Sequence, residues 1–203
     1  MLQAESPPLV LASGSPARRA LLANAGLRFT VRPADVDEAA LKRQARAQGL
    51  RASEAALILA DAKAIRVAQD DPGALVIGAD QILDCDGVWY DKPPDMAGAR
   101  RQLLALHGRS HTLATAVVLR QGDRRLWQHS GLPRLTMRTL SAQFLDAYLA
   151  AEGSHVLASV GAYRLEGPGV QLFTAVEGDH ATILGLPLLP LLGFLREAGV
   201  LRP

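Results

Sequence analysis

The fold is indicated by one stretch near the N-terminus, Leu9-Val10-Leu11-Ala12-Ser13-Gly14-Ser15-Pro16. Its first four residues form a short apolar run, which predicts a buried strand. The small polar residues and the proline that follow predict a tight turn and then a helix, because proline suits a first helical position. We expect this helix to reach Ala25 and to end at Gly26. A strand, a turn and a helix in this order are typical of an α/β protein.

Helix and strand patterns alternate along the rest of the chain. The predicted strands cover 29–32, 74–79, 81–83, 88–90, 111–120, 125–130, 135–139, 170–176 and 181–184; the predicted helices cover 53–70, 95–107, 141–151 and 187–199, with a loop or helix start at 35–38. Short turns such as Asp86-Gly87 join several strands, so some pairs are expected to be antiparallel. The prediction is an α/β fold, a mixed twisted sheet flanked by helices, in a single domain over residues 1–203.

Composition excludes several classes of protein. Of the 203 residues, 49% are hydrophobic and 21% are charged, which argues against a disordered chain or a collagen. The lone cysteine, Cys85, allows no internal disulfide and fits a reducing cytoplasm. The longest apolar stretch, 183–195, contains prolines and is too short to span a bilayer, and no N-terminal signal is visible. We therefore expect a cytoplasmic protein with no membrane partner.

The charge pattern favours a small anionic ligand. Lys and Arg total 22 against 20 Asp and Glu, a net charge of +2. The chain has no basic tail and only 4% aromatic residues, so no nucleic-acid partner is expected. The basic residues cluster locally, as at Arg18-Arg19, and such a cluster attracts small anions.

The predicted first helix breaks a local rule. Arg18 and Arg19 lie in its first turn, where acidic residues normally complement the helix dipole. A bound triphosphate would supply the negative charge, since N–H groups at a helix start and an arginine side chain both bind phosphate oxygens. The same segment also fits a plain helix with Ser15 as its N-cap.

Further charged residues suit phosphate chemistry. Asp80 ends the predicted strand at 74–79, where ligands bind in α/β sheets, and it could ligate Mg²⁺, activate water or simply begin a turn. Lys92 precedes a proline in extended backbone, and Lys63 lies among apolar helix residues, from which it could snorkel or reach a phosphate. The acids at 35–38 could bind metal or begin a helix. The sequence contains no P-loop or dinucleotide fingerprint and no zinc-ligand spacing.

Motifs spread over nearly the whole chain resemble, in order, those of the Maf family of nucleoside triphosphate pyrophosphatases. They are Leu9–Pro16 with Arg18, Asp37-Glu38, Ala62-Lys63-Ala64, Gly78-Ala79-Asp80, Lys92-Pro93, Gly108–His111, Gly161–Tyr163 with Glu166-Gly167, and Gly185–Leu188. The resemblance implies an inosine-triphosphatase-like fold, dependence on Mg²⁺ or Mn²⁺ and a cytoplasmic homodimer. It also implies a hydrolase that cleaves a nucleoside triphosphate between the α and β phosphates, giving a monophosphate and pyrophosphate.

The resemblance also assigns roles by position. Asp80 would be the base that activates water, and Glu38 and Asp80 would bind the metal. Lys63 and Lys92 are counted with Asp80 as catalytic residues. The triphosphate would be held by basic and hydroxyl side chains: Arg18, Lys63, Lys92, Ser13 and Ser15.

Three positions bear on which nucleobase the substrate carries. Ala17 replaces the first arginine of the commonest family opening, and the branch that acts on 7-methyl-GTP often has an aromatic residue there. Gln81 and Glu166 resemble that branch, whereas the dTTP- and UTP-directed branch usually has Thr and Gln. A glutamate can accept hydrogen bonds from guanine N–H groups and offset the positive charge of the methylated base. We therefore expect Ala17, Gln81 and Glu166 in the substrate site and 7-methyl-GTP as the substrate, with dTTP and UTP as the alternative.

Two other functions remain open from the sequence. A nucleotidyltransferase has a similar strand–loop opening with a later arginine. A nucleotide-sensing module linked to cell division would bind without turnover. The number of carboxylate and basic candidates argues against the second.

Overall fold

The predicted opening of the chain is confirmed by the computed structural model, which describes residues 2–202. β1 (Leu9–Leu11) leads into α1 (Pro16–Asn24), and β2 (Thr30–Val31) follows. The chain forms two compact units. Unit 1 takes in the residues up to 81, residues 115–131 and those from 179 onward, and unit 2 takes in 82–114 and 132–178.

Unit 1 contains a mixed sheet, as predicted. β1 pairs in parallel with β2 and with β3 (Leu75–Cys85). β6 (Arg124–Gly131) pairs antiparallel with β5 (Ser110–Gln121). β3 and β5 are neighbours in the strand order, and both continue into unit 2. The α/β fold class with a mixed sheet is therefore confirmed.

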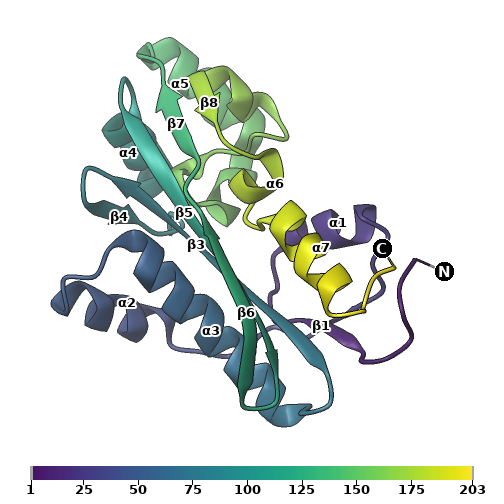
Figure 1. Cartoon of the computed structure of the whole chain (residues 1–203). Helices are drawn as coiled ribbons and strands as arrows, with labels where there is room; N and C mark the ends of the chain where they lie inside the picture. Colours follow the sequence, from purple (N-terminus) through teal and green to yellow (C-terminus); the bar gives the residue numbers. More distant parts are fainter. Residues whose placement is uncertain (1, 203) are drawn as a thin grey trace. The chain divides into compact units, whose positions relative to one another are not determined.

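Helices cover both faces of these strands (Figure 1). α1 and α7 (Leu188–Glu197) pack on one face, where their buried leucines join the alternate residues Leu9, Leu11, Leu75 and Ile77 in one core. α3 (Ala52–Asp70) lies on the other face, beside α2 (Glu38–Ala47). Because strand side chains alternate, Val76, Gly78 and Asp80 point to the opposite face from Ile77.

α3 approaches β3 closely at Gly78. A Cβ atom at this glycine would lie 2.1 Å from the carbonyl oxygen of Ala60 and 2.9 Å from the Cβ of Ala64. The small residues of α3 meet a strand position without a side chain, so the helix backbone rests almost directly on the strand. The next residue on this face of β3 is Asp80, and the turn of α3 that contains Ala60 and Ala64 also carries Lys63.

Unit 2 has its own strands and helices. Its strands beyond β3 and β5 are β4 (Val88–Tyr90), β7 (Arg134–Met137) and β8 (Phe173–Glu177). β4 forms the predicted hairpin with the end of β3, and the turn residues Asp86 and Gly87 have φ of 51° and 82°. β7 pairs antiparallel with the start of β5 and with β8.

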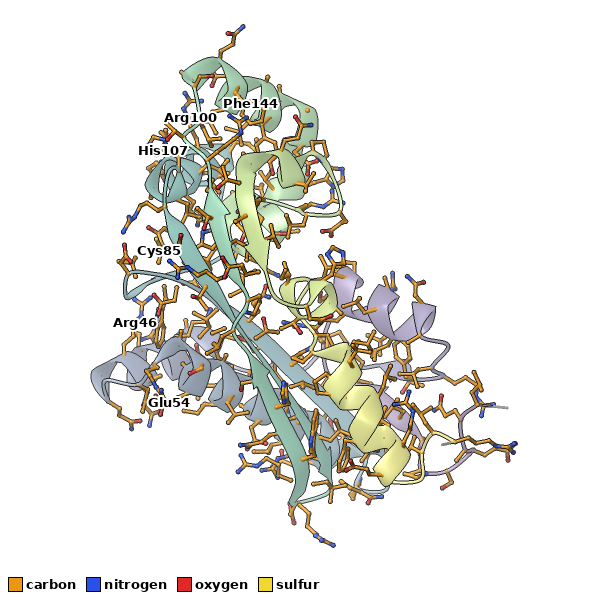
Figure 2. The ribbon with its side chains drawn as sticks, turned by 45° about the horizontal axis from the view of Figure 1, so that its top comes forward. Arg46, Glu54, Cys85, Arg100, His107 and Phe144 are labelled. Atoms are coloured by element: carbon orange, nitrogen blue, oxygen red, sulfur yellow. The ribbon has the colours of Figure 1, made fainter. Side chains whose placement is uncertain are left out.

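Two helices of unit 2 lie against each other. These are α4 (Met96–Leu106) and α5 (Ala142–Glu152), and an ion pair joins Arg100 of α4 to Asp146 of α5. Figure 2 labels Arg100 and also Phe144 of α5, whose ring centroid lies 4.0 Å from the guanidinium carbon of Arg138. Three 3-10 helices follow α5: η1 (Gly153–Ala158), η2 (Val160–Ala162) and η3 (Pro168–Leu172).

The prediction was wrong at three places. The predicted strands at 74–79 and 81–83 form one strand, β3, so Asp80 lies in the middle of a strand and does not end one. The predicted strand at 181–184 is instead the helix α6 (His180–Ile183). Its start is fixed by Asp179, whose carboxylate accepts hydrogen bonds from the backbone N–H of Thr182 at 2.8 Å and from its hydroxyl at 2.7 Å. The predicted strand at 170–176 begins as η3 and becomes extended only at Phe173.

Two further findings concern the helices. The acids at 35–38 begin a full helix, α2, of which the sequence indicated only the start. Among the described residues, no helix has the length and apolar character needed to cross a membrane.

Candidate active site

The turn between β1 and α1 is built by two serines. Ser15 is the N-cap of α1, its hydroxyl accepting a hydrogen bond from the backbone N–H of Arg18 at 3.4 Å, and Pro16 follows in the first turn. The Ser13 hydroxyl accepts a hydrogen bond from the backbone N–H of Ser15 at 3.3 Å. The first turn contains no acidic residue. Ser15 is thus a helix cap, and the binding of an anion at this turn stays a prediction.

Arg18 points inward rather than to solvent. Only 9% of the residue is exposed. Its Nε donates to the backbone oxygen of Gly185 at 2.8 Å, and its Nη1 donates to the Ser13 hydroxyl at 3.0 Å. Burial lowers the pKa of the Arg18 guanidinium, while the negative charges of Asp80 and Glu38 act in the opposite direction. The guanidinium is therefore held rigidly, within the field of both acids.

Lys63 joins two of the predicted acids. Its Nζ lies 2.5 Å from Oδ1 of Asp80 and 2.8 Å from Oε1 of Glu38. The Lys63 and Asp80 side chains are 9% and 7% exposed, whereas that of Glu38 is 46% exposed. Local structure explains the arrangement: Asp37 caps α2 by accepting from the backbone N–H of Ala40 at 2.8 Å, which places Glu38 at the first residue of that helix.

One oxygen of this cluster has unused capacity. Oδ2 of Asp80 is buried and, within residues 2–202, has no hydrogen-bond partner. A buried acceptor without a partner costs free energy, about 1–3 kcal/mol. The cost is removed if a water molecule or a cation binds this oxygen.

The two carboxylates fit a hard divalent cation that also binds substrate. The part of the chain that the structure describes has no group of three or more His, Cys, Asp or Glu side chains placed to hold a metal ion by themselves. Mg²⁺ is usually bound by one or two carboxylates together with waters and substrate phosphates. The carboxylates of Asp80 and of the half-exposed Glu38 match that requirement.

Gln81 lies beside Asp80 and is engaged with the protein itself. Its side-chain Nε2 donates to the Thr115 hydroxyl at 2.8 Å and to the backbone oxygens of Thr182 and Ile183 at 3.3 and 3.0 Å. These contacts connect β3, β5 and α6. Neither Thr115 nor Thr182 stands out in the sequence as a site residue, and Thr182 lies in the segment wrongly expected to be a strand.

The structure brings together most, but not all, of the predicted site residues. In unit 1, Ser13 and Arg18 share a hydrogen bond, and Lys63 pairs with both Glu38 and Asp80. The negative charges of the two acids act on Arg18. Ala17 is half-buried in the first turn of α1.

Lys92 and Glu166 belong to unit 2. Lys92 is exposed just after β4. Arg164 lies between two acids, with its Nε 3.9 Å from Oε1 of Glu166 and its Nη1 3.6 Å from Oε2 of the buried Glu152. The roles expected for Lys92 and Glu166 stay predictions.

The comparison with known families agrees with this geometry. The geometry combines a buried aspartate–lysine pair between β3 and α3 with a buried arginine in the first turn of α1. Such a set of charges suits a site that holds an anion together with a cation. The family model described as "Maf-like protein" matches residues 8–198. The chain belongs to the Maf-like protein family.

Relatives match over nearly their whole length. A "Nucleoside triphosphate pyrophosphatase" of Paramagnetospirillum magneticum is 56% identical over 96% of this chain and 100% of its own. One of the same name from Gluconobacter oxydans is 56% identical over 97% of both chains. A "7-methyl-GTP pyrophosphatase" of Mesorhizobium japonicum is 51% identical over 95% of this chain and 97% of its own.

Proposed function

We propose that this chain is a nucleoside triphosphate pyrophosphatase that adds water across the α–β phosphoanhydride bond, with 7-methyl-GTP as its preferred substrate. The observation that carries the proposal is the Asp80–Lys63–Glu38 chain of ion pairs, whose acids also act electrostatically on the buried Arg18. The names of the relatives support the reaction class.

Asp80 is suited to accept a proton from water. Lys63 occupies Oδ1 and compensates the negative charge, which leaves the buried Oδ2 as the acceptor. A water bound there has its proton within reach of a fixed carboxylate, which is the arrangement that general-base catalysis requires. The water oxygen forms a bond to one phosphorus as the bridging P–O bond breaks, which gives a nucleoside monophosphate and pyrophosphate. The proton accepted by Asp80 is then released to solvent.

Lys63 and Arg18 are suited to bind the triphosphate. The Lys63 ammonium has three N–H donors, of which two reach Glu38 and Asp80, so one remains for a phosphate oxygen. Arg18 is fixed by Gly185 and Ser13 and needs no rearrangement to present its charge. Glu38 and Asp80 would hold Mg²⁺ or Mn²⁺, which neutralises phosphate charge when bound. Lys92 is proposed as a further phosphate ligand.

Glu166 supports the choice of 7-methyl-GTP. Its half-exposed carboxylate can accept from the guanine N–H groups and compensate the cationic base. Gln81 is the second position at which the chain resembles the 7-methyl-GTP branch, and several relatives carry that name. The same reaction on dTTP or UTP is the alternative.

We further propose that the protein acts as a cytoplasmic homodimer. Light scattering on the purified protein tests whether it is a dimer.

A nucleotide panel tests the substrate. Pyrophosphate release is measured with Mg²⁺ on 7-methyl-GTP, GTP, dTTP and UTP, and the highest kcat/KM is expected for 7-methyl-GTP. A preference for dTTP and UTP would select the alternative. Release of one pyrophosphate or less per protein molecule on every nucleotide would instead favour a sensing module.

Substitution of Asp80, the proposed general base, tests the mechanism. Asp80→Asn should lower kcat by about 10²–10⁴-fold with little change in KM, because the amide cannot accept the proton. The matched control is Asp70→Asn, since Asp70 is an exposed acid at the end of α3 that pairs with Arg66. Wild-type turnover by Asp80→Asn would rule out Asp80 as the base.

A further inference from the structure

We propose that Gln81 is a positioning residue that holds Arg18 in place for the triphosphate, acting through the backbone of residues 182–185, here called the α6 turn. The inference rests on the proposed function, since it concerns the same substrate. It assigns to Gln81 a role in phosphate binding rather than contact with the nucleobase.

The α6 turn connects the two side chains directly. On one side, Gln81 Nε2 donates to the backbone oxygens of Thr182 and Ile183 at 3.3 and 3.0 Å. On the other side, the backbone oxygen of Gly185 accepts from Arg18 Nε at 2.8 Å. The side-chain nitrogen of Gln81 and the guanidinium of Arg18 are thus bound to opposite ends of the same four-residue backbone segment.

Further contacts fix the backbone of the α6 turn at Thr182. Thr115 donates its hydroxyl hydrogen to the same Thr182 oxygen at 3.1 Å and accepts from Gln81 at 2.8 Å, which closes a ring of hydrogen bonds. The side chain of Thr182 lies against Gly131, where an added Cβ would be only 2.5 Å from Thr182 Cγ2. The position of the Thr182 backbone is therefore fixed from both β5 and β6.

The far end of the turn is shaped to receive the arginine. Gly185 has φ of 104°, a conformation that side chains disfavour, and a Cβ there would lie 3.3 Å from Arg18 Nε. Its carbonyl oxygen accepts from the guanidinium of Arg18, a residue that is 9% exposed and that also donates to the Ser13 hydroxyl. A shift of the turn would carry the Gly185 oxygen with it and change the direction in which Arg18 faces a phosphate.

The nitrogen of Gln81 is already occupied in this arrangement. An amide nitrogen has two N–H groups, and here three protein oxygens compete for them. Contact with a nucleobase through this nitrogen would break the ring of hydrogen bonds with Thr115 and the turn. The geometry thus favours a supporting role for Gln81.

The test uses inorganic tripolyphosphate, which has the phosphate chain but no base. Its binding is measured by calorimetry on the full chain as wild type, Gln81→Met, Arg18→Met and the double variant. Gln81→Met should weaken binding about tenfold, the order expected when a hydrogen bond involving a charged group is lost. In the Arg18→Met background the same substitution should change binding less than about twofold, because residues that act as one unit are non-additive.

Two variants control for folding. Gln121→Met removes an exposed glutamine that donates to the Gly73 oxygen at 3.1 Å in the same unit, and it should leave binding unchanged. If Gln81→Met does not fold, Thr115→Val removes the hydroxyl that completes the ring and carries the same expectation. Thermal unfolding of each variant shows whether lost binding reflects lost structure.

Three results would overturn the inference. In the first, Gln81→Met binds tripolyphosphate as the wild type does but prefers a different nucleobase. In the second, Gln81→Met weakens tripolyphosphate binding equally in the wild type and in the Arg18→Met variant. In the third, the wild type does not bind tripolyphosphate. A wild type that binds tripolyphosphate with the expected coupling but releases no pyrophosphate from any nucleotide would refute the proposed function and support the positioning role.

Discussion

Protonation of His111 should destabilise the fold as the pH falls. His111 is 2% exposed in unit 2, and its Nε2 lies 2.7 Å from the hydroxyl of Tyr163. Its Nδ1 is buried and has no partner in the described part of the chain. Burial lowers the pKa of His111 from 6.5 to about 4. In the charged imidazolium both ring nitrogens carry an N–H group, and the one at Nδ1 has no acceptor among residues 2–202.

The sign and size follow from proton linkage. Between pH 6.5 and about 4 the unfolded chain binds a proton at this histidine and the folded chain does not, so acid favours unfolding. The free energy of unfolding therefore decreases as the pH falls through this window. Below the window His111 causes no further decrease. The shift corresponds to about 3 kcal/mol in total and about 2 kcal/mol between pH 7 and pH 5.

Urea unfolding at pH 7 and pH 5 measures the effect. The wild type should lose about 2 kcal/mol more over this interval than His111→Gln, which cannot titrate. His129→Gln is the matched control, because His129 is exposed on β6, and it should behave as the wild type. An equal loss in His111→Gln and the wild type would refute the reasoning, since the pH dependence would then come from other groups.

Three further outcomes are expected. Gly78→Ala should lower the free energy of unfolding in urea by about 3 kcal/mol or more, because its Cβ would overlap Ala60. Gly73→Ala has open space around it and should change that free energy by less than about 1 kcal/mol, so similar unfolding midpoints for the two variants would contradict this account. Lys63→Met should cost about 3–5 kcal/mol by leaving Asp80 buried without its cation, and the exposed Arg66→Met should cost at most about 0.5 kcal/mol in the same assay. Excess EDTA should stop pyrophosphate release and added Mg²⁺ should restore it; undiminished activity in EDTA would exclude the proposed metal.

Much of the fold follows from local sequence signals. The apolar run before Ser13 and the proline at position 16 predict β1 and α1, and Asp86-Gly87 predicts the β3–β4 hairpin. In each case the determinant lies within a few residues of the element it sets. The segment 181–184 shows the limit of such signals: a short run with threonine and isoleucine suits a strand, but the Asp179 side chain caps it as a helix.

The site was predictable in its residue types but not in its connections. Arg18, Lys63 and Asp80 stand out as charged residues beside apolar elements. That Arg18 turns inward depends on the Gly185 oxygen, 167 residues away in sequence, and no local pattern announces such a contact. Lys63 was expected to snorkel or to reach a phosphate, yet it pairs with two acids, because the α2 helix that presents Glu38 was only partly foreseen.

The missing side chain at Gly78 sets how far Lys63 must reach. With the α3 backbone resting almost on β3, the lysine meets the carboxylate two residues along at 2.5 Å without slack. Any redesign of this protein should therefore keep small residues at positions 60, 64 and 78, because they set the distance between α3 and β3. A single methyl group inserted there would move the Asp80 carboxylate away from the Lys63 ammonium without a change to either residue.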